Sequence, residues 1–344
     1  MTKITAPLTL MGAPGSPYTR KMLAVLRYRR IPYELLIGGF RNPRPRLPKP
    51  KVALLPTFYL PGDDGELEAV TDSTPLIRRF EAAFEGRSII PTDPALAFLD
   101  YLLEDYADEW LTKAMFHYRW HYQADIDKAA EILPRWTVEP NTDEALAPIS
   151  KMIGERQISR LYVVGSNDTT APVIEASYER YLDAMAAHLE KHAFLFGARP
   201  SSADFAAYGQ LTQLVGFDPT PAAVTLARAP RVYAWVDVVD DLSGLEAADD
   251  QWLDPKAIPQ SLSDLFTEVG RVYVPAMLAN EQAIAAGSEM VECEIDNRPW
   301  VQKPFPYQAK CLGWVRTQYA ALDDDARAIV NGVLDGTGCE KLLT

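Results

Sequence analysis

The stretch LTLMGAPGSPYTRKML, residues 8–23, decides the fold of the N-terminal part of this chain. Residues 8–11 form a short apolar run that predicts a β-strand, and residues 12–17 hold two Gly and two Pro, which is typical of a turn. Residues 18–30 predict a helix that ends in arginines, where cations suit the helix dipole. Ser16 followed by Pro17 has the chemistry of a helix N-cap.

The segments that follow predict a small mixed sheet. Residues 33–37 read as a second strand, and residues 54–60 and 66–70 flank the turn PGDDG as a hairpin. A helix capped by Ser73 or Thr74 then runs to about residue 84. The order β-α-β requires a crossover helix and a parallel strand pair, and β-β-α follows it. This is the order of a thioredoxin-like domain.

The rest of the chain predicts mainly helices. Beyond a linker at 89–94, helices are expected at 96–122, 143–163, 172–192, 202–215 and 229–241, which together indicate a bundle. From residue 242 the pattern predicts a helix at 262–286, a hairpin at 291–302 that turns at Asp296-Asn297, and helices at 307–322 and 324–334. The fold class is therefore α/β plus all-α. Three domains are predicted: a thioredoxin-like domain at 1–88, an all-helical domain at 93–241, and an α+β C-terminal extension at 242–344 that packs on the helical domain.

Composition narrows the classes of protein. The chain has 344 residues, of which 48% are hydrophobic and 24% charged, which is enough apolar material for more than one core. The three cysteines Cys293, Cys311 and Cys339 form no CxxC pair, which argues for a reducing compartment and against a disulfide framework or zinc site. His117 and His121 share a helix face without an evident third ligand, so no metal is predicted. Without a secretory signal or an apolar span, we expect a cytoplasmic protein with no membrane partner.

Charge is distributed unevenly. The net charge of −13 disfavours nucleic acid as a partner. Residues 1–90 nevertheless carry 14 Lys and Arg against 8 Asp and Glu, while the remainder carries 20 against 39. A loop of sequence RNPRPRLPKPK, residues 41–51, contributes much of this excess. Either a small anion binds in the first part, or the basic residues are simply solvated.

Three short motifs offer polar groups at element ends. Ser16 either caps its helix or also serves a ligand, since a helix N-terminus presents free amides and a positive dipole end to an anion or a thiolate. Leu55-Pro56 stands at a strand start, where Pro fits because it lacks an amide proton. In TDSTP, residues 71–75, Asp72 and Ser73 either cap the helix or hold a ligand's ammonium and carboxylate.

These motifs, in this order, resemble the glutathione-binding domain of serine-type cytosolic glutathione transferases. A distant segment, GARPSSADFAAYGQL at residues 197–211, is similar to the helix-capping segment of the same family's helical domain. Ser201 would be its N-cap and Asp204 the third helical residue of a capping box. The resemblance covers roughly residues 7–240.

The resemblance implies a site for glutathione as co-substrate. Ser16 would donate a hydrogen bond to the glutathione sulfur, Leu55 before a cis Pro56 would bind the cysteinyl amide through its backbone, and Asp72 with Ser73 would hold the γ-glutamyl end. No Tyr precedes Tyr18 and no Cys stands at position 16, so the tyrosine and cysteine types of the family do not apply. Leu54 departs from the polar residue common there. The glycyl contact would then come from Lys49, Lys51 or Arg46, or be absent.

The resemblance also implies an activity. The enzyme would activate the glutathione thiolate for attack on a small apolar electrophile, and it would form a homodimer. Trp110, Tyr118 and Trp120 would supply an aromatic wall for that electrophile, unless they are bundle core. Two alternatives stay open: a non-catalytic or weakly catalytic ligand-binding protein on the same scaffold, and a glutathione-dependent lyase, isomerase or peroxidase.

Overall fold

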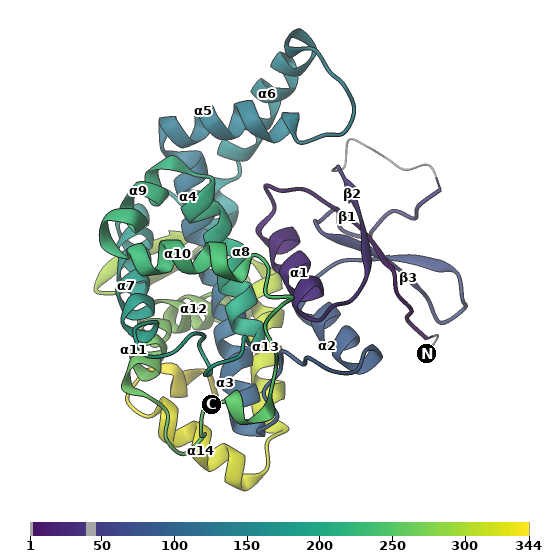
Figure 1. Ribbon diagram of the computed structural model, residues 1–344. Coiled ribbons are helices and arrows are strands. Elements are labelled where there is room, and N and C mark those ends of the chain that lie inside the picture. Colours follow the sequence, from purple (N-terminus) through teal and green to yellow (C-terminus); the bar gives the residue numbers. More distant parts are fainter. Residues whose placement is uncertain (1–2, 39–45, 344) are drawn as a thin grey trace.

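The computed structural model of the chain describes residues 3–38 and 46–343. A small sheet with two helices stands beside a large helical body, and helix α1 (Pro17–Tyr28) lies between them against α8 (Ser202–Gly216) (Figure 1). The pair formed by α1 and α8 is therefore one of the main contacts between the N-terminal part and the helical body.

The sheet has the predicted mixed topology. Its strands are β1 (Leu8–Gly12), β2 (Tyr33–Ile37), β3 (Thr57–Pro61) and β4 (Leu67–Val70), in the order β2-β1-β3-β4. β1 pairs with β2 in parallel, with Leu10 opposite Leu35, and with β3 in antiparallel. β3 begins after Pro56 rather than at residue 54, and Leu55-Pro56 is a cis peptide. The thioredoxin-like order is therefore confirmed.

The helical body begins with one long, nearly continuous helix. α3 (Pro94–Tyr106) passes through a π-helical turn (Ala107–Leu111) into α4 (Thr112–His121), which matches the helix predicted at 96–122. The other helices of this body are α5 (Gln123–Ile132), α6 (Asp143–Ile158), α7 (Ala171–His188), α8, α9 (Pro219–Arg228) and α10 (Pro230–Val239). The sequence patterns missed α5 and α9. Two prolines in the first turn of α9 obscured it, although Pro at N1 is compatible with a helix start.

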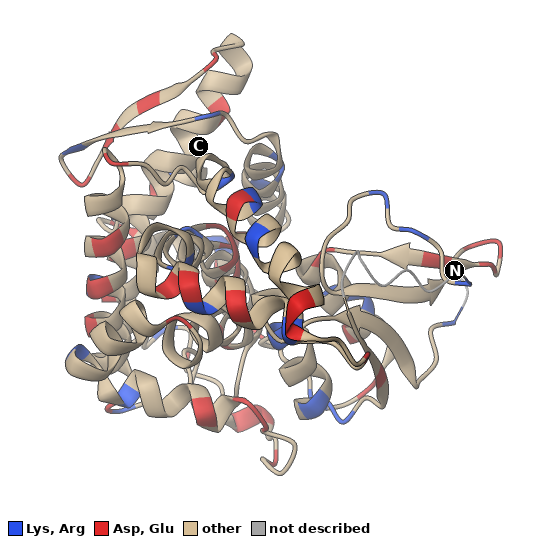
Figure 2. Cartoon of the chain, turned by 90° about the horizontal axis from the view of Figure 1, so that it is seen from above, with Lys and Arg blue, Asp and Glu red and all other residues tan. Residues whose placement is uncertain are grey.

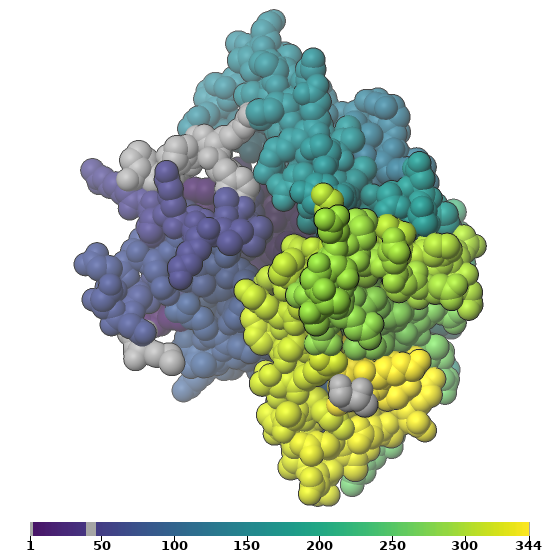
Figure 3. Space-filling model, turned by 180° about the vertical axis from the view of Figure 1, so that it is seen from behind, coloured from purple at the N-terminus to yellow at the C-terminus, as the bar shows by residue number. Residues whose placement is uncertain are grey.

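The C-terminal segment, residues 242–343, spreads over the helical body and borders the N-terminal part (Figure 3). It contains α11 (Gln260–Glu268), a second π-helical turn (Val269–Tyr273), α12 (Val274–Ala286), the hairpin β5 (Val291–Ile295) and β6 (Arg298–Gln302), α13 (Pro306–Ala320) and α14 (Asp324–Leu334). The predicted hairpin turn is present, with φ of 53° at Asp296 and 57° at Asn297, as a primed two-residue turn requires. None of the helices in the described residues is long and apolar enough to cross a membrane.

Helices α1 and α8 approach each other at backbone distance. A Cβ added to Gly209 of α8 would lie 2.7 Å from the Pro17 carbonyl oxygen and 3.0 Å from the Lys21 Cβ. Only glycine allows this crossing, because those neighbours are backbone or the base of a side chain. The first turn of α1 is consequently fixed by direct contact with the middle of α8.

The start of α8 carries the predicted capping box. Ser201 is the N-cap, and Asp204 Oδ2 accepts hydrogen bonds from the Ser201 amide at 2.9 Å and the Ser201 hydroxyl at 2.8 Å. Asp204 Oδ1 also accepts from the Leu195 amide at 2.9 Å. This buried carboxylate therefore ties the loop before α8 to the helix start.

Replacing Asp204 by Ala should lower the free energy of unfolding by about 3 kcal/mol, because two buried amides lose their acceptor. Ser201→Ala, which removes only a hydroxyl from the same box, should lower it by about 1 kcal/mol. Denaturant unfolding of the two variants and the parent chain measures both values. Equal losses would contradict the role given to Asp204.

Candidate functional site

Ser16 lies in the loop between β1 and α1 and is the N-cap of α1. Its Oγ accepts a hydrogen bond from the Thr19 amide at 3.2 Å and donates one to the Leu55 carbonyl oxygen, also at 3.2 Å. The structure therefore confirms the cap, and the hydroxyl has a second partner in a neighbouring loop, while its role toward a ligand stays a prediction. Two residues that the sequence singled out separately, Ser16 and Leu55, are in direct contact.

The helical body holds the loop that carries Ser16. Arg119 of α4 donates to the Gly15 carbonyl at 3.0 Å while it forms an ion pair with Asp218, and Gln213 of α8 donates to the Pro14 carbonyl at 3.2 Å. Sequence patterns gave no sign of Arg119 or Gln213, because their partners lie about 100 and 200 positions away. Both side chains position the Ser16 loop from outside its own domain.

Asp72, directly before α2 (Ser73–Ala83), has an unusual backbone with φ of 84°. A non-glycine residue in that region is uncommon and costs energy, and such residues concentrate at functional sites. Asp72, rather than Ser73 or Thr74, occupies the N-cap position of α2, and the Thr74 amide lowers the pKa of its carboxyl. Asp72 Oδ2 also accepts a 2.6 Å hydrogen bond from the Tyr307 hydroxyl of α13.

Ser73 joins a buried ionic network centred on Lys21. The Lys21 ammonium, 1% exposed, donates to Ser73 Oγ at 3.2 Å, to Glu104 Oε1 at 2.8 Å and to Asp108 Oδ2 at 2.6 Å. Burial by itself lowers the pKa of Lys21, but the charges of Asp108 and Glu104 outweigh burial and raise the pKa above its ordinary value. Lys21 is therefore a charged group that connects α1, α2 and the long helix.

The carboxyl groups around this network differ in their charge. Burial raises the pKa of Glu104, yet Arg78 and Lys21 lower it to about 2, so Glu104 is ionised. Burial and neighbouring carboxylates raise the pKa of Asp105 to about 7 and of Glu109 to about 8. Near neutral pH, Glu109 therefore holds its proton in the fold.

The predicted aromatic wall belongs to the core. Trp110, Tyr118 and Trp120 are only 1%, 3% and 1% exposed. The Trp110 indole N–H donates to Ser177 Oγ. Trp110 lies in the π-helical turn, Tyr118 and Trp120 lie in α4, and all three fill space between packed helices. Their burial favours the core alternative, and their role in binding a substrate stays a prediction.

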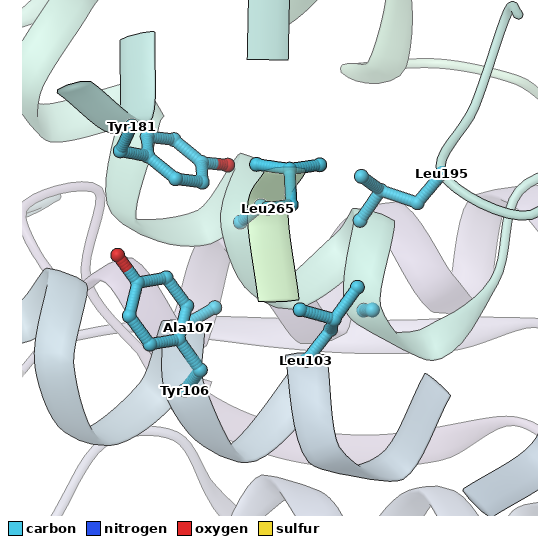
Figure 4. Close-up of a pocket in the computed structure, with 8 residues that line it drawn as sticks. Leu103, Tyr106, Ala107, Tyr181, Leu195 and Leu265 are labelled. Carbon is cyan, nitrogen blue, oxygen red and sulfur yellow. The ribbon is translucent and has the colours of Figure 1, made fainter. Parts of the chain in front are cut away.

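A small cavity in the same core is no substrate site either. It measures about 10 Å³ and is lined by residues of α3, α7, α8 and α11, with the Tyr106 and Tyr181 rings on one side (Figure 4). Within the described residues, the hydroxyls of Tyr106 and Tyr181 lack a hydrogen-bond partner. A space of about this size holds one water molecule, so the cavity suits a water and not an organic substrate.

Two apolar residues that the sequence did not single out lie beside the Ser16 loop. A Cβ on Gly15 would be 2.4 Å from a ring carbon of Trp136 and 2.5 Å from a Leu133 methyl group. Both side chains are half-buried, and Trp136 also packs on Phe217. The segment after α5, which no periodic pattern marked, therefore brings apolar surface next to Ser16.

The basic residues proposed for the glycyl end lie on the surface. Lys49 and Lys51 are exposed, as are Arg46 and Leu54, while residues 41–45 of the same loop lie outside the described residues. Basic positions recur along the loops around the sheet, and acidic positions recur along the helices (Figure 2). The contact of Lys49 or Lys51 with the glycyl end of glutathione therefore stays a prediction.

The remaining candidate groups are engaged in structural contacts. His117 shares hydrogen bonds with Ser166 at 2.8 Å and with Glu175 at 3.0 Å. Across residues 3–38 and 46–343, no cluster of three or more His, Cys, Asp or Glu is arranged to hold a metal ion. Cys311 of α13 is buried, and burial together with nearby carboxylates raises the pKa of its thiol. A raised pKa disfavours the reactive thiolate.

Glu109→Gln should change how stability depends on pH. Its folded pKa of about 8 exceeds the unfolded value of about 4.3, so its stabilising contribution is complete below pH 4.3 and is lost as pH rises to about 8. Between pH 5 and 8 the parent chain should therefore lose stability relative to the Gln variant, by at most about 1.4 kcal/mol per pH unit. Denaturant unfolding at several pH values, with exposed Glu289→Gln as control, measures this. A stability difference independent of pH would show that Glu109 is not protonated by burial.

Two stretches of the chain match models of one protein family. Residues 10–88 match the family model of the glutathione S-transferase N-terminal domain, and residues 143–237 match that of the C-terminal domain. No curated protein is close enough in sequence to match this chain.

The solved structures that match this chain are distant from it in sequence. A Tau-class glutathione S-transferase from mango, Mangifera indica, has 17% identity and a TM-score of 0.42, over 75% of this chain and 95% of that one. A glutathione transferase from Burkholderia graminis, solved with two glutathione molecules bound per subunit, has 16% identity and a TM-score of 0.41, over 67% and 82%. A glutathione S-transferase from Rhodospirillum rubrum has 17% identity and a TM-score of 0.42, over 75% of this chain and 99% of that one.

The two family models together span about half of the chain and include Ser16 and the Ser201–Asp204 box. The chain therefore belongs to the glutathione S-transferase superfamily.

Proposed function

We propose that this protein is a glutathione transferase that binds glutathione beside Ser16 and stabilises its thiolate. The observation that carries the proposal is the contact of the Ser16 hydroxyl with the Leu55 carbonyl, at the N-terminus of α1, within the segment that matches the family's N-terminal domain. A hydroxyl that only capped α1 would not need a second partner 39 positions away. Rotation of the same O–H group would redirect it to a sulfur atom.

The chemistry needs no covalent bond to the protein. The free thiol of a cysteine has a pKa of about 8.5, and a helix N-terminus and a hydrogen-bond donor both favour the thiolate. Ser16 Oγ–H would donate to the sulfur while the α1 dipole stabilises its negative charge. The thiolate then attacks an electrophile that the protein holds nearby, so the protein contributes electrostatic stabilisation and positioning.

Asp72 and Ser73 suit the two charged groups of the γ-glutamyl end. The Asp72 carboxylate would pair with the ammonium group, and the Ser73 hydroxyl with the carboxylate. Ser73 Oγ accepts a hydrogen bond from Lys21, so its own proton remains available for a ligand oxygen. The Leu55 backbone and Pro56 would face the cysteinyl part, and Lys49 or Lys51 the glycyl part.

The electrophile would lie between the Ser16 loop and the helical body. Leu133 and Trp136 support this placement, because they are the half-buried apolar side chains that reach Gly15. The homodimer, the cytoplasmic location and the small hydrophobic electrophile all remain predictions. So does the division of the chain at residues 88, 93 and 241.

Two other functions use the same site. A ligand-binding protein without catalysis would bind glutathione but leave the thiol pKa unchanged. A glutathione-dependent lyase, isomerase or peroxidase would lower that pKa and differ only in the second substrate. Measuring the thiol pKa therefore separates binding from catalysis without a known electrophile.

Calorimetric titration of the full chain with glutathione should show binding, and Asp72→Ala should weaken it by about tenfold or more, because a charge-assisted contact is lost. Exposed Asp63→Ala, on the hairpin turn of the same domain, is the matched control. Absence of binding by the parent chain at millimolar glutathione would refute the proposed function.

Ser16→Ala should raise the pKa of the bound glutathione thiol by about one unit, which corresponds to a loss of about 1.4 kcal/mol of thiolate stabilisation. Ultraviolet absorbance of the thiolate, followed against pH, measures the pKa directly. Ser16→Thr keeps a hydroxyl and a cap and should retain the low pKa. The same thiol pKa in the parent chain and in Ser16→Ala would exclude Ser16 as the donor.

A further inference from the structure

The C-terminal segment places one side chain on the proposed glutathione site. Tyr307, in the first turn of α13, donates its hydroxyl to Asp72 Oδ2 at 2.6 Å across 235 positions of sequence. Neither family model reaches this segment, since the second ends at residue 237. The contact is thus an addition that this chain makes to the parts it shares with its superfamily.

The position of Tyr307 is fixed on both sides. Just before α13, Phe305 exchanges two hydrogen bonds with the Asn280 side chain of α12, at 2.7 and 3.0 Å. Just after Tyr307, the Gln308 amide donates to the Glu109 carbonyl of the π-helical turn at 3.3 Å. The Tyr307 ring itself packs against Phe305 and Trp314, with centroids 6.1 Å apart in both pairs. The hydroxyl is therefore held in place by the fold rather than free to sample many positions.

We propose that Tyr307 is a positioning residue of the glutathione site, which orients the Asp72 carboxylate through Oδ2 so that Oδ1 receives the ligand's ammonium group. The proposal rests on the proposed function above. A carboxylate has two oxygens with several acceptor positions, so a hydroxyl on one oxygen and an ammonium on the other are compatible. The hydroxyl also stabilises the ionised form of Asp72, which the pairing with an ammonium requires.

The groups around Asp72 agree with that second effect. Burial raises the pKa of Asp72, and the Tyr307 hydrogen bond and the Lys21 charge of α1 lower it. Glu104 of α3 and Asp108 of the π-helical turn are like charges that disfavour a second anion, and the Cys311 thiol of α13 also faces this region. Without the Tyr307 hydroxyl, Asp72 should take up a proton at higher pH.

The test compares Tyr307→Phe with the parent full-length chain by calorimetry. Two ligands are used: glutathione, and the analogue in which hydrogen replaces the γ-glutamyl amino group. We expect Tyr307→Phe to weaken glutathione binding by about tenfold and to leave binding of the analogue unchanged. The acid limb of glutathione binding against pH should also move to higher pH. Tyr319→Phe is the matched control, because its hydroxyl is on the same helix and bonds Asn331 on the surface.

The outcomes separate the two proposals. Equal or tighter glutathione binding by Tyr307→Phe overturns the positioning role, and tighter binding would mean that the hydroxyl competes with the ligand. An equal loss for both ligands also overturns it, since the effect would then be structural. If the parent chain binds neither ligand, the proposed function itself fails, and the role of Tyr307 fails with it.

Discussion

A single buried ammonium constrains the arrangement of the N-terminal part and the helical body. Taking the charge of Lys21 out of water costs several kcal/mol, which its two carboxylate partners and one hydroxyl offset only if all are in place. These partners come from α2 and from the long helix, while Lys21 itself is on α1. Three elements are thereby fixed at one point. Ser16, at the start of α1, and Ser73, at the start of α2, acquire a fixed spatial relation as a consequence.

Features with short-range causes could be predicted from the sequence. The strand and helix around Ser16, the hairpin turn at Asp296-Asn297 and the capping box at Ser201 each depend on a few neighbouring residues, and all are present. The grouping of Ser16 with Leu55 followed from resemblance, and the structure shows the contact.

Features with long-range causes could not be predicted. A helical pattern places Trp110 and Tyr118 on a helix, but it does not indicate which other helices cover them. In the structure both side chains are buried in the core. The burial of Lys21 depends on carboxylate partners that lie more than 80 positions away in the sequence. The link from Tyr307 to Asp72 spans most of the chain. In each case the deciding neighbour is tertiary, and one sequence carries no local sign of it.

The π-helical turn Ala107–Leu111 has a consequence for how this protein can vary. Such a turn amounts to one extra residue in an α-helix, and each residue rotates a helix by about 100°. Within this turn, the Asp108 carbonyl accepts a hydrogen bond from the Tyr18 hydroxyl at 2.8 Å. Deleting one residue here would turn α4 relative to α3 and carry Arg119 away from the Gly15 carbonyl. The length of this helix is therefore under as much constraint as its composition, and insertions or deletions should be tolerated in the loops around it instead.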